Sequence, residues 1–479
     1  MITFTVALLL LLIGYFTYGR VVERIFRPDA NRKTPAVTKA DGVDFLPLPT
    51  WKIFMIQFLN IAGLGPIFGA IMGAQFGTAS YLWIVFGTIF AGAVHDFFSG
   101  ALSIRHGGES LPELVGRFLG AKTKNVMCVF TIILMILVGA VFVSGPAELL
   151  AGMTPDYMNG IFWMIVIFLY YILATLLPID KVIGRIYPLF AFALLFMAVS
   201  ILVMLYWNHP ELPEMWNGLG TKYEASPIFP MMFISIACGA ISGFHATQSP
   251  LMARCLVNEK YCRPVFYGAM VTEGIVALIW AAAATYFFHD NGIVDAETGI
   301  PYSGAKVATM ISKEWLGTFG SILAILGIVA APITSGDTAL RSARLIVADF
   351  FRIEQKTIWK RLFVSIPIFL VTMGILFYSL NDADGFKIIW RYFAWCNQTL
   401  AIFTLWAITV YMVVERKAYI VALIPALFMT CVCTTYILMA PEGFALSNWL
   451  AYIMGGVFTI LSLILFIVWY NKRKAYEKI

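Results

Sequence analysis

Residues 53–77 read IFMIQFLNIAGLGPIFGAIMGAQFG, an apolar run long enough to cross a membrane but interrupted near its middle. Asn60, Gly63, Gly65 and Pro66 fall in this interruption. Proline removes a backbone donor and glycine permits non-helical angles, so the run predicts a discontinuous helix. Non-helical backbone at bilayer depth survives only where it is buried in protein or lines a wet cavity.

A second apolar run, residues 227–250, carries the same kind of interruption. It reads PIFPMMFISIACGAISGFHATQSP, and its second half holds more polar and glycine residues than an apolar span needs. For the first run alone, a kinked helix packed tightly through Gly65, Gly69 and Gly73 explains the sequence equally well. Two such interruptions favour a pair of discontinuous helices.

The composition places the chain in a membrane. Of its 479 residues, 60% are hydrophobic and 13% are charged, and the mean hydropathy is +0.83. A soluble protein has about 25% charged residues, so this chain could not keep its surface in water. We expect an all-α polytopic protein of about thirteen transmembrane helices. The expected spans are 2–19, 53–74, 80–103, 124–147, 160–177, 187–206, 228–248, 266–288, 315–336, 361–380, 387–413, 418–439 and 448–470.

The basic residues alternate with these spans. Of the 33 Lys and Arg residues, 28 fall in the loops and tail of one side. The positive-inside rule makes that side cytoplasmic, with the N-terminus outside and the C-terminus inside. The net charge of +6 therefore indicates contact with anionic lipids rather than with nucleic acid.

The two interrupted spans lie five helices apart and run in opposite directions, which is typical of inverted-repeat transporters. This predicts a 5+5 inverted repeat, an arrangement that resembles the fold of the amino-acid/polyamine/organocation superfamily. The expected units are an anchor helix at 1–19, a cytoplasmic loop at 20–52, repeats at 53–206 and 228–413 around a periplasmic loop at 207–227, and two C-terminal helices with a basic tail at 414–479.

Several long motifs then identify a family resemblance. The strings QFLNIAGLGPIFGAIMGAQFG (57–77), WIVFGTIFAGAVHDFFSGALSIRHGG (83–108), VSGPAELL (143–150), DKVIGRIYP (180–188), ISGFHATQSPLMAR (241–254) and APITSGDTALRSARLIVAD (331–349) resemble the carbon starvation protein A family. The resemblance covers roughly residues 1–440 and looks like a short form that lacks extra C-terminal helices. It implies a bacterial inner-membrane transporter linked to nutrient limitation, importing peptides or, as in related members, pyruvate together with protons.

The interruptions would frame the substrate site. The N-terminal ends of half-helices carry partial positive charge and free N–H groups, which favours a carboxylate. Both pyruvate and a peptide offer a carboxylate, so the choice between them stays open. The expected substrate-binding residues are Asn60, Gly63, Gly65, Gly239, Ser242, Phe244, His245 and Gln248, with Gln57, Trp395, Asn397 and Gln398 as further contacts.

Titratable side chains within apolar spans are functional candidates because a charge there is costly. We expect a coupling ion, a proton or sodium, at a site that includes Asp96 and Asp337. By analogy with the symporter fold, the carbonyl of Ala62 with the hydroxyls of Thr334 and Ser335 would supply oxygen ligands, as sodium prefers. Glu273 is a weaker candidate.

Each of these residues also has a plain structural interpretation. His95 and Asp96 would pair to hold two helices together, and Asp337 would pair with Arg341 one turn on. Glu148 would be a gate at the outer end of its helix, or merely an interfacial residue. The arginines at 341, 344 and 352 would bind lipid headgroups from an interfacial helix.

Other classes of protein fit less well. No H-E-x-x-H zinc motif or paired intramembrane aspartates are present, so we expect no enzyme. A channel would not need an inverted repeat, and no cytoplasmic segment is long enough for a sensor. The seven cysteines are scattered without a C-x-x-C pair, so we expect packing roles, no metal and no cofactor.

Overall fold

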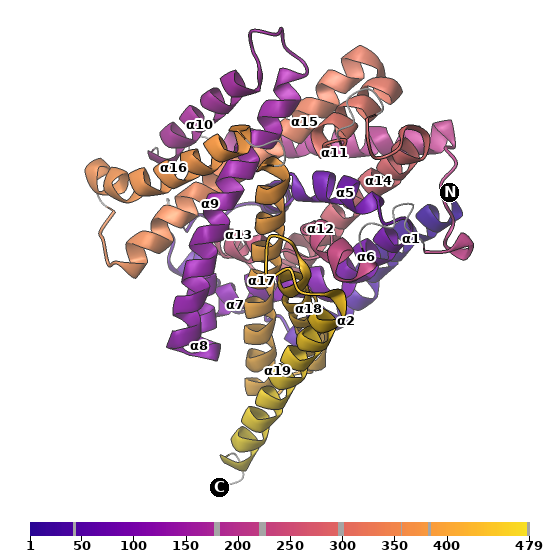
Figure 1. The fold of residues 1–479 in the computed structure, drawn as a ribbon. Coiled ribbons are helices and arrows are strands. Elements are labelled where there is room, and N and C mark those ends of the chain that lie inside the picture. The colour runs from indigo at the N-terminus through magenta and orange to yellow at the C-terminus, as the bar shows by residue number, and fades with distance from the viewer. Residues whose placement is uncertain are drawn as a thin grey trace.

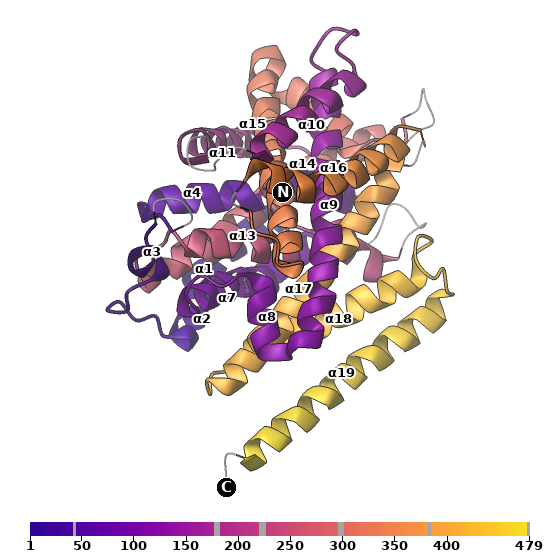
Figure 2. The same ribbon diagram turned by 90° about the vertical axis from the view of Figure 1, so that its left-hand side faces the viewer.

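The chain folds into a bundle of crossing helices (Figures 1 and 2). The structure, a computed structural model, describes residues 1–41, 45–176, 183–219, 227–295, 301–355, 357–381 and 385–476. Over these ranges the regular structure is helical, apart from one isolated β-bridge between Val294 and Pro301. The long helices α9 (Ala121–Ala151) and α17 (Gly385–Val414) cross the bundle in contact with each other.

Most of the described helices are suited to a membrane. Ten are long and apolar enough to cross one, and the number rises to eleven when one bent helix pair is taken as a single span. The ten are Ile2–Phe26, Ala79–Arg105, Ala121–Ala151, Pro188–Asn208, Glu259–Asn291, Gly320–Ala348, Ile358–Leu380, Gly385–Val414, Ile420–Met439 and Asn448–Lys474. The polytopic all-α class is thus confirmed, and the count of thirteen stays a prediction. Residues 220–226 of the expected periplasmic loop lie outside the described residues.

The periphery of the bundle is formed by apolar helices with little burial. The C-terminal helix α19 (Asn448–Tyr476) lies on the outside against α18 (Ile420–Met439) in both views (Figures 1 and 2). In the most apolar stretch of α19, only 17% is buried. In the span Glu259–Asn291, which contains α14 (Gly268–Asn291), the buried share of the corresponding stretch is 89%. The inner helices surround the two interrupted segments, while α19 offers its sides to lipid.

The first interrupted segment is broken as predicted. Helix α4 (Thr50–Ile61) ends at Ala62, whose ψ of 55° is not helical. The chain resumes as the π-helix η1 (Gly65–Gly69) and α5 (Ala70–Ala74), and the two parts are bent by 56°. Pro66 has no N–H to donate to the carbonyl four residues earlier, so the helical ladder stops at this point.

The second interrupted segment is broken over a longer stretch. The short helices η5 (Ile228–Met232) and α12 (Phe233–Ser235) precede it, and α13 (Gly243–Ala253) follows. Between them, residues 236–242 contain no helix. A Cβ atom on Gly243 would lie 2.3 Å from the carbonyl oxygen of Asn397, so α13 can begin this close to α17 only with glycine there.

The two breaks pack directly against each other. The glycine stripe of the first broken helix faces the second one, and any added Cβ atom would press on it. The facing pairs are Gly65 with Cys238, Gly69 with Ser235, and Gly73 with Ile236. The tight-packing interpretation of this stripe and the discontinuous-helix interpretation are therefore both correct. Small residues allow two irregular backbones to approach closely.

One expected helix boundary is wrong. The sequence predicts a span over 315–336 that ends just before Asp337. In the structure α15 runs from Gly304 to Phe350, with a kink at Gly317, where φ is +63°. Asp337 therefore lies well inside the helix instead of ending it. The first helix also extends further than expected, because α1 (Ile2–Phe16) continues as α2 (Tyr18–Phe26).

The arginines of α15 explain why this helix continues. The side chains of Arg341 and Arg344 are buried, with 8% and 5% exposed, so the expected lipid-facing placement is wrong for both. Arg341 donates from Nη2 to the carbonyl oxygen of Ala174 at 2.5 Å and lies 3.6 Å from Oδ1 of Asp337. Paired charges can be buried where single ones cannot. Arg352, beyond the end of the helix, is exposed.

We expect the contact between the breaks to be sensitive to a single methyl group. In Gly65→Ala the new Cβ would lie 2.2 Å from Cβ of Cys238, and overpacking of this kind costs about 1–3 kcal/mol. Thermal unfolding of the purified protein in detergent should shift down by several degrees. Gly456→Ala in α19 is the matched control, because nothing lies within 4 Å of its added Cβ. Equal melting temperatures for the two variants would contradict the contact.

Candidate functional site

A cluster of titratable side chains lies beside the second break. Asp96, on α7 (Ala93–Arg105), accepts from two imidazoles: Nδ1 of His95 lies 2.7 Å from Oδ1, and Nδ1 of His245 lies 2.8 Å from Oδ2. All three side chains are fully buried. Because an ionised carboxylate only accepts, both Nδ1 atoms carry the proton in this arrangement. The expected pairing of His95 with Asp96 is present, and His245 joins it from another helix.

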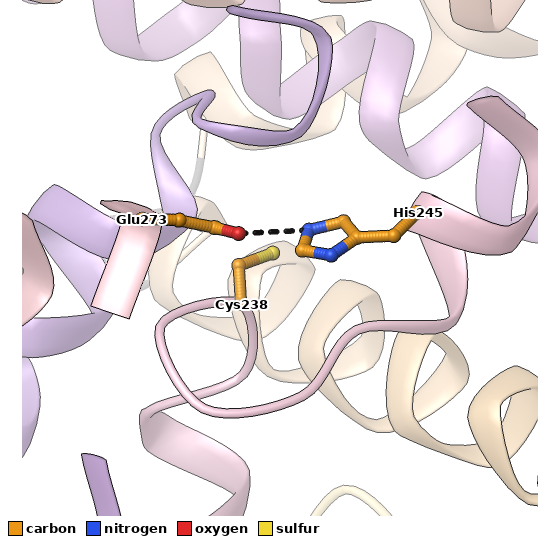
Figure 3. A group of neighbouring side chains, drawn as sticks. All are labelled: Cys238, His245 and Glu273. Carbon is orange, nitrogen blue, oxygen red and sulfur yellow. Dashed lines mark ion pairs between the residues drawn. The ribbon is translucent and has the colours of Figure 1, made fainter. Parts of the chain in front are cut away.

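His245 extends the cluster to a second carboxylate. Its Nε2 atom lies 3.4 Å from Oε2 of Glu273 on α14, which is also fully buried. His245 projects from the first turn of α13, directly after the break, as Figure 3 shows. The thiol of Cys238, within the break, points into the same space, so three elements converge there. Glu273 thus belongs to the site, although the sequence made it the weakest candidate.

The beginning of α13 is held by a side chain from α17. Oδ1 of Asn397 accepts from the backbone N–H of Phe244 at 2.7 Å and from the hydroxyl of Ser242 at 3.0 Å. Its Nδ2 atom lies 3.3 Å from Sγ of Cys238. The first backbone N–H groups of a helix have no acceptor within the helix, and the side-chain oxygen of Asn397 is the acceptor for one of them. Asn397 therefore fixes both the break and the direction in which His245 points.

Most of the other expected substrate contacts are buried around the breaks, whereas Trp395 is half-buried and donates to the carbonyl oxygen of Cys433 at 3.0 Å. Gln57 on α4 donates to Oγ of Ser249 on α13 at 3.2 Å, which joins the two broken helices a second time. The side-chain oxygens of Gln57, Asn60 and Gln248 have no hydrogen-bond partner. A Cβ atom added at Gly239 would lie 2.6 Å from Cβ of Ala277, so Gly239 packs closely against that residue. Buried polar atoms without a partner are rare and require an explanation, such as an ordered water or a polar ligand.

The expected cation residues are only partly brought together. Oγ of Ser335 lies 3.2 Å from the carbonyl oxygen of Asn60 and 3.4 Å from that of Leu59, so α15 does meet the end of α4. Thr334 directs its hydroxyl to carbonyls of its own helix, at Ala330 and Ala331. That Ser335, Thr334 and Ala62 bind an ion stays a prediction.

Two expected residues lie apart from the cluster. Glu148, near the end of α9, is exposed and accepts from the hydroxyl of Ser303 at 2.5 Å. Asp337 is 2% exposed and pairs with Arg341, as the plain interpretation expected. The gate and coupling roles assigned to them remain predictions.

Cys238 is the site residue that the sequence did not reveal. The sequence favours a packing role for it, because the cysteines are scattered and form no C-x-x-C pair. Only the fold brings it next to His245 and Glu273, from a non-helical segment and from another helix. The one available signal was its position inside the interrupted run.

Two facing broken helices within a buried core define a polytopic helical membrane protein with a transporter-type fold. A manganese transporter of Eremococcus coleocola has a similar structure, with a TM-score of 0.58 over 90% of this chain and 98% of that one. The two share 11% sequence identity, so the likeness concerns the fold alone. It confirms the fold class predicted from the sequence.

The chain belongs to the family described as carbon starvation protein CstA, whose model matches residues 1–156, 155–299 and 286–436. An uncharacterized membrane protein of Haemophilus influenzae is 43% identical, over 60% of this chain and 92% of its own. The peptide transporter CstA of Bacillus subtilis is 26% identical, over 95% and 93%. The pyruvate/proton symporter BtsT of Escherichia coli is 28% identical, over 57% of this chain and about half, 47%, of its own length.

We expect Asn397 to be replaceable only by an acceptor. In Asn397→Leu the buried N–H of Phe244 would lose its partner, which costs about 1–3 kcal/mol. The variant should unfold at a temperature several degrees lower, as measured by differential scanning fluorimetry. Asn397→Gln keeps an amide acceptor without adding a buried charge and should recover part of the loss. A leucine variant as stable as the parent protein would show that this amide does not hold the break.

Proposed function

We propose that the protein is a secondary active transporter that imports small nutrients bearing a carboxylate, with peptides as the first substrate class. The observation that carries this proposal is the packing of two broken helices against each other at their breaks. In transporters of this kind the substrate site lies where such helices are interrupted. Transport requires no chemical step, so we assign no enzymatic activity.

The chemistry around the second break supports a carboxylate. The N-terminal end of α13 lies at the break, and helix N-termini attract negative charge. The unsatisfied side-chain oxygens of Asn60 and Gln248 would suit the N–H groups of a peptide bond or ammonium. Pyruvate has no such donors, and this favours peptides over pyruvate, the alternative substrate. The peptide transporter of Bacillus subtilis, similar along nearly its whole length, supports the same choice.

We propose that the transporter is driven by protons across the bacterial inner membrane, with its N-terminus outside and its C-terminus in the cytoplasm. The chain's membership of the family described as carbon starvation protein CstA and its similarity to a pyruvate/proton symporter support the choice of protons. Asp337 is the proposed coupling residue. It is buried, and one of its oxygens has no hydrogen-bond partner despite Arg341 nearby. Protonation would neutralise it and release the arginine.

The function can be tested with purified protein in proteoliposomes. We expect uptake of a labelled dipeptide that increases several-fold when an inward proton gradient is imposed and disappears with an uncoupler. Labelled pyruvate serves as the alternative substrate in parallel vesicles. Exchange of internal unlabelled dipeptide for external label, without a gradient, should persist, because a carrier exchanges its substrate and a pore does not. Uptake of neither substrate above that of empty vesicles would refute the proposal.

Asp337→Asn tests the coupling residue. We expect gradient-dependent accumulation to fall at least tenfold, while exchange without a gradient is kept, because the amide cannot carry the proton but preserves the shape of the side chain. Asp156→Asn is the control, since Asp156 is exposed on the loop before α10 (Gly160–Leu176). Normal gradient-driven accumulation in Asp337→Asn would remove this residue from the coupling mechanism without affecting the transport assignment.

A further inference from the structure

We propose that Cys238, His245 and Glu273 form a binding site for a divalent transition-metal ion of the zinc type. Each offers one ligand atom, a thiol sulfur, an imidazole nitrogen and a carboxylate oxygen, and all of these atoms lie within 4.8 Å of one another. Figure 3 shows the three side chains directed at one common point. This inference is independent of the proposed transport activity and revises the expectation of no metal.

The distances fit such an ion after a small contraction. Zinc binds sulfur at about 2.3 Å and nitrogen or oxygen at about 2.0–2.2 Å, which places tetrahedral ligands roughly 3.6 Å apart. His245 Nε2 and Glu273 Oε2 already lie 3.4 Å apart. No two of the ligand atoms are more than 4.8 Å apart, so each separation exceeds the ideal by about 1 Å at most, which a change of side-chain torsion in Cys238 or Glu273 would close.

The imidazole and the carboxylate of this group have hydrogen-bonding capacity left, whereas Sγ of Cys238 accepts from Asn397 at 3.3 Å and lies 3.5 Å from Oγ of Ser242. Nε2 of His245 and both carboxylate oxygens of Glu273 are buried and have no hydrogen-bond partner, although Nε2 and Oε2 face each other as an ion pair at 3.4 Å. Unsatisfied buried polar atoms are rare and costly in folded proteins, and each requires an explanation. Here the atoms lie together and face the sulfur of Cys238, so a single cation would satisfy them all.

The surroundings orient the histidine as metal sites do. Its Nδ1 atom donates to Asp96 at 2.8 Å, which leaves Nε2 as the lone-pair atom directed at Glu273 and Cys238. A carboxylate that accepts from the far nitrogen of a ligating histidine fixes its tautomer and increases its basicity. Asp96 is itself held by His95 at 2.7 Å, so this supporting carboxylate is well fixed.

The donor set selects the class of ion. Thiolate and imidazole favour zinc and similar borderline-soft cations, whereas magnesium, calcium and manganese prefer oxygen ligands. Three protein ligands leave a fourth position open, as in zinc sites that bind a water or a substrate. The bound ion would link the non-helical stretch 236–242, α13 and α14, and so fix the second break in one arrangement.

The plainer explanation is a packing cysteine beside a polar histidine–carboxylate cluster. A buried free cysteine ordinarily behaves as a small apolar side chain. Packing accounts for Cys238 against Gly65, but it does not account for two unsatisfied side chains of α13 and α14 that face the same sulfur. A metal ion accounts for the three together.

Zinc binding to the folded protein, purified without a histidine tag, tests the site. The protein is first washed with a chelator and then titrated with zinc against a chromophoric competitor. We expect one zinc ion to bind per chain, which elemental analysis should confirm. Cys238→Ser and Glu273→Gln should each weaken binding at least tenfold, and Asp96→Asn by about ten- to a hundredfold through the loss of its hydrogen bond. Cys431→Ser in α18 should bind as the parent does, and Mn²⁺ should bind more weakly than Zn²⁺.

Cobalt reports on the sulfur ligand directly. Co²⁺ added to the parent protein and to Cys431→Ser should produce a thiolate-to-cobalt charge-transfer band that Cys238→Ser lacks. Gel filtration and melting temperature confirm that each variant is folded, and His289→Ala removes the exposed His289–Asp290 pair as a background site. Zinc retained at full affinity in folded Cys238→Ser and Glu273→Gln, or no zinc bound by the parent, would overturn the proposal.

Discussion

A backbone that leaves the helical pattern inside a bilayer finds no water for its amides and carbonyls, and each unsatisfied group costs several kcal/mol. Both breaks in this protein exist under that constraint. The second is satisfied from three directions: Asn397 accepts from the amide of Phe244, Thr88 donates to the carbonyl of Gly239 at 3.1 Å, and Gln398 donates to that of Phe233 at 2.5 Å. Helices far apart in the sequence thus supply what the break itself lacks.

The two breaks are stabilised by different means, and this gives them different freedom. At the first, Ser335 reaches the carbonyls of Leu59 and Asn60, and Gly65 and Gly73 pack against the side chains of Cys238 and Ile236. At the second, hydrogen bonds and charges from α7, α14 and α17 converge on one short stretch. Packing contacts tolerate small shifts, whereas a buried hydrogen bond is either made or lost. We infer that the second break is the better defined of the two.

The sequence predicts the breaks because proline, glycine and polar residues inside an apolar run disrupt the helix locally. Pro66 and the residues from Gly239 to Gln248 therefore indicate the broken helices without knowledge of any partner. The prediction fails where tertiary contacts decide. The span ending at residue 336 looked complete because Asp337 and Arg341 are charged, and only burial as a pair, with Ala174 as acceptor, lets α15 continue. Cys238 and Glu273 likewise become candidate site residues only because the fold places them beside His245.

Asp96 restricts how the bundle can rearrange. Its two oxygens are used by different elements, Oδ1 by His95 of its own helix and Oδ2 by His245 of α13. If α13 moved away from α7, a fully buried carboxylate would lose a charge-assisted hydrogen bond, and the imidazole would lose its orienting partner. Any transition that separates the broken helices must therefore carry α7 with α13, or replace His245 by another donor. A rearrangement in which α13 alone slides past α7 is therefore disfavoured, unless another donor takes the place of His245 at Oδ2 of Asp96.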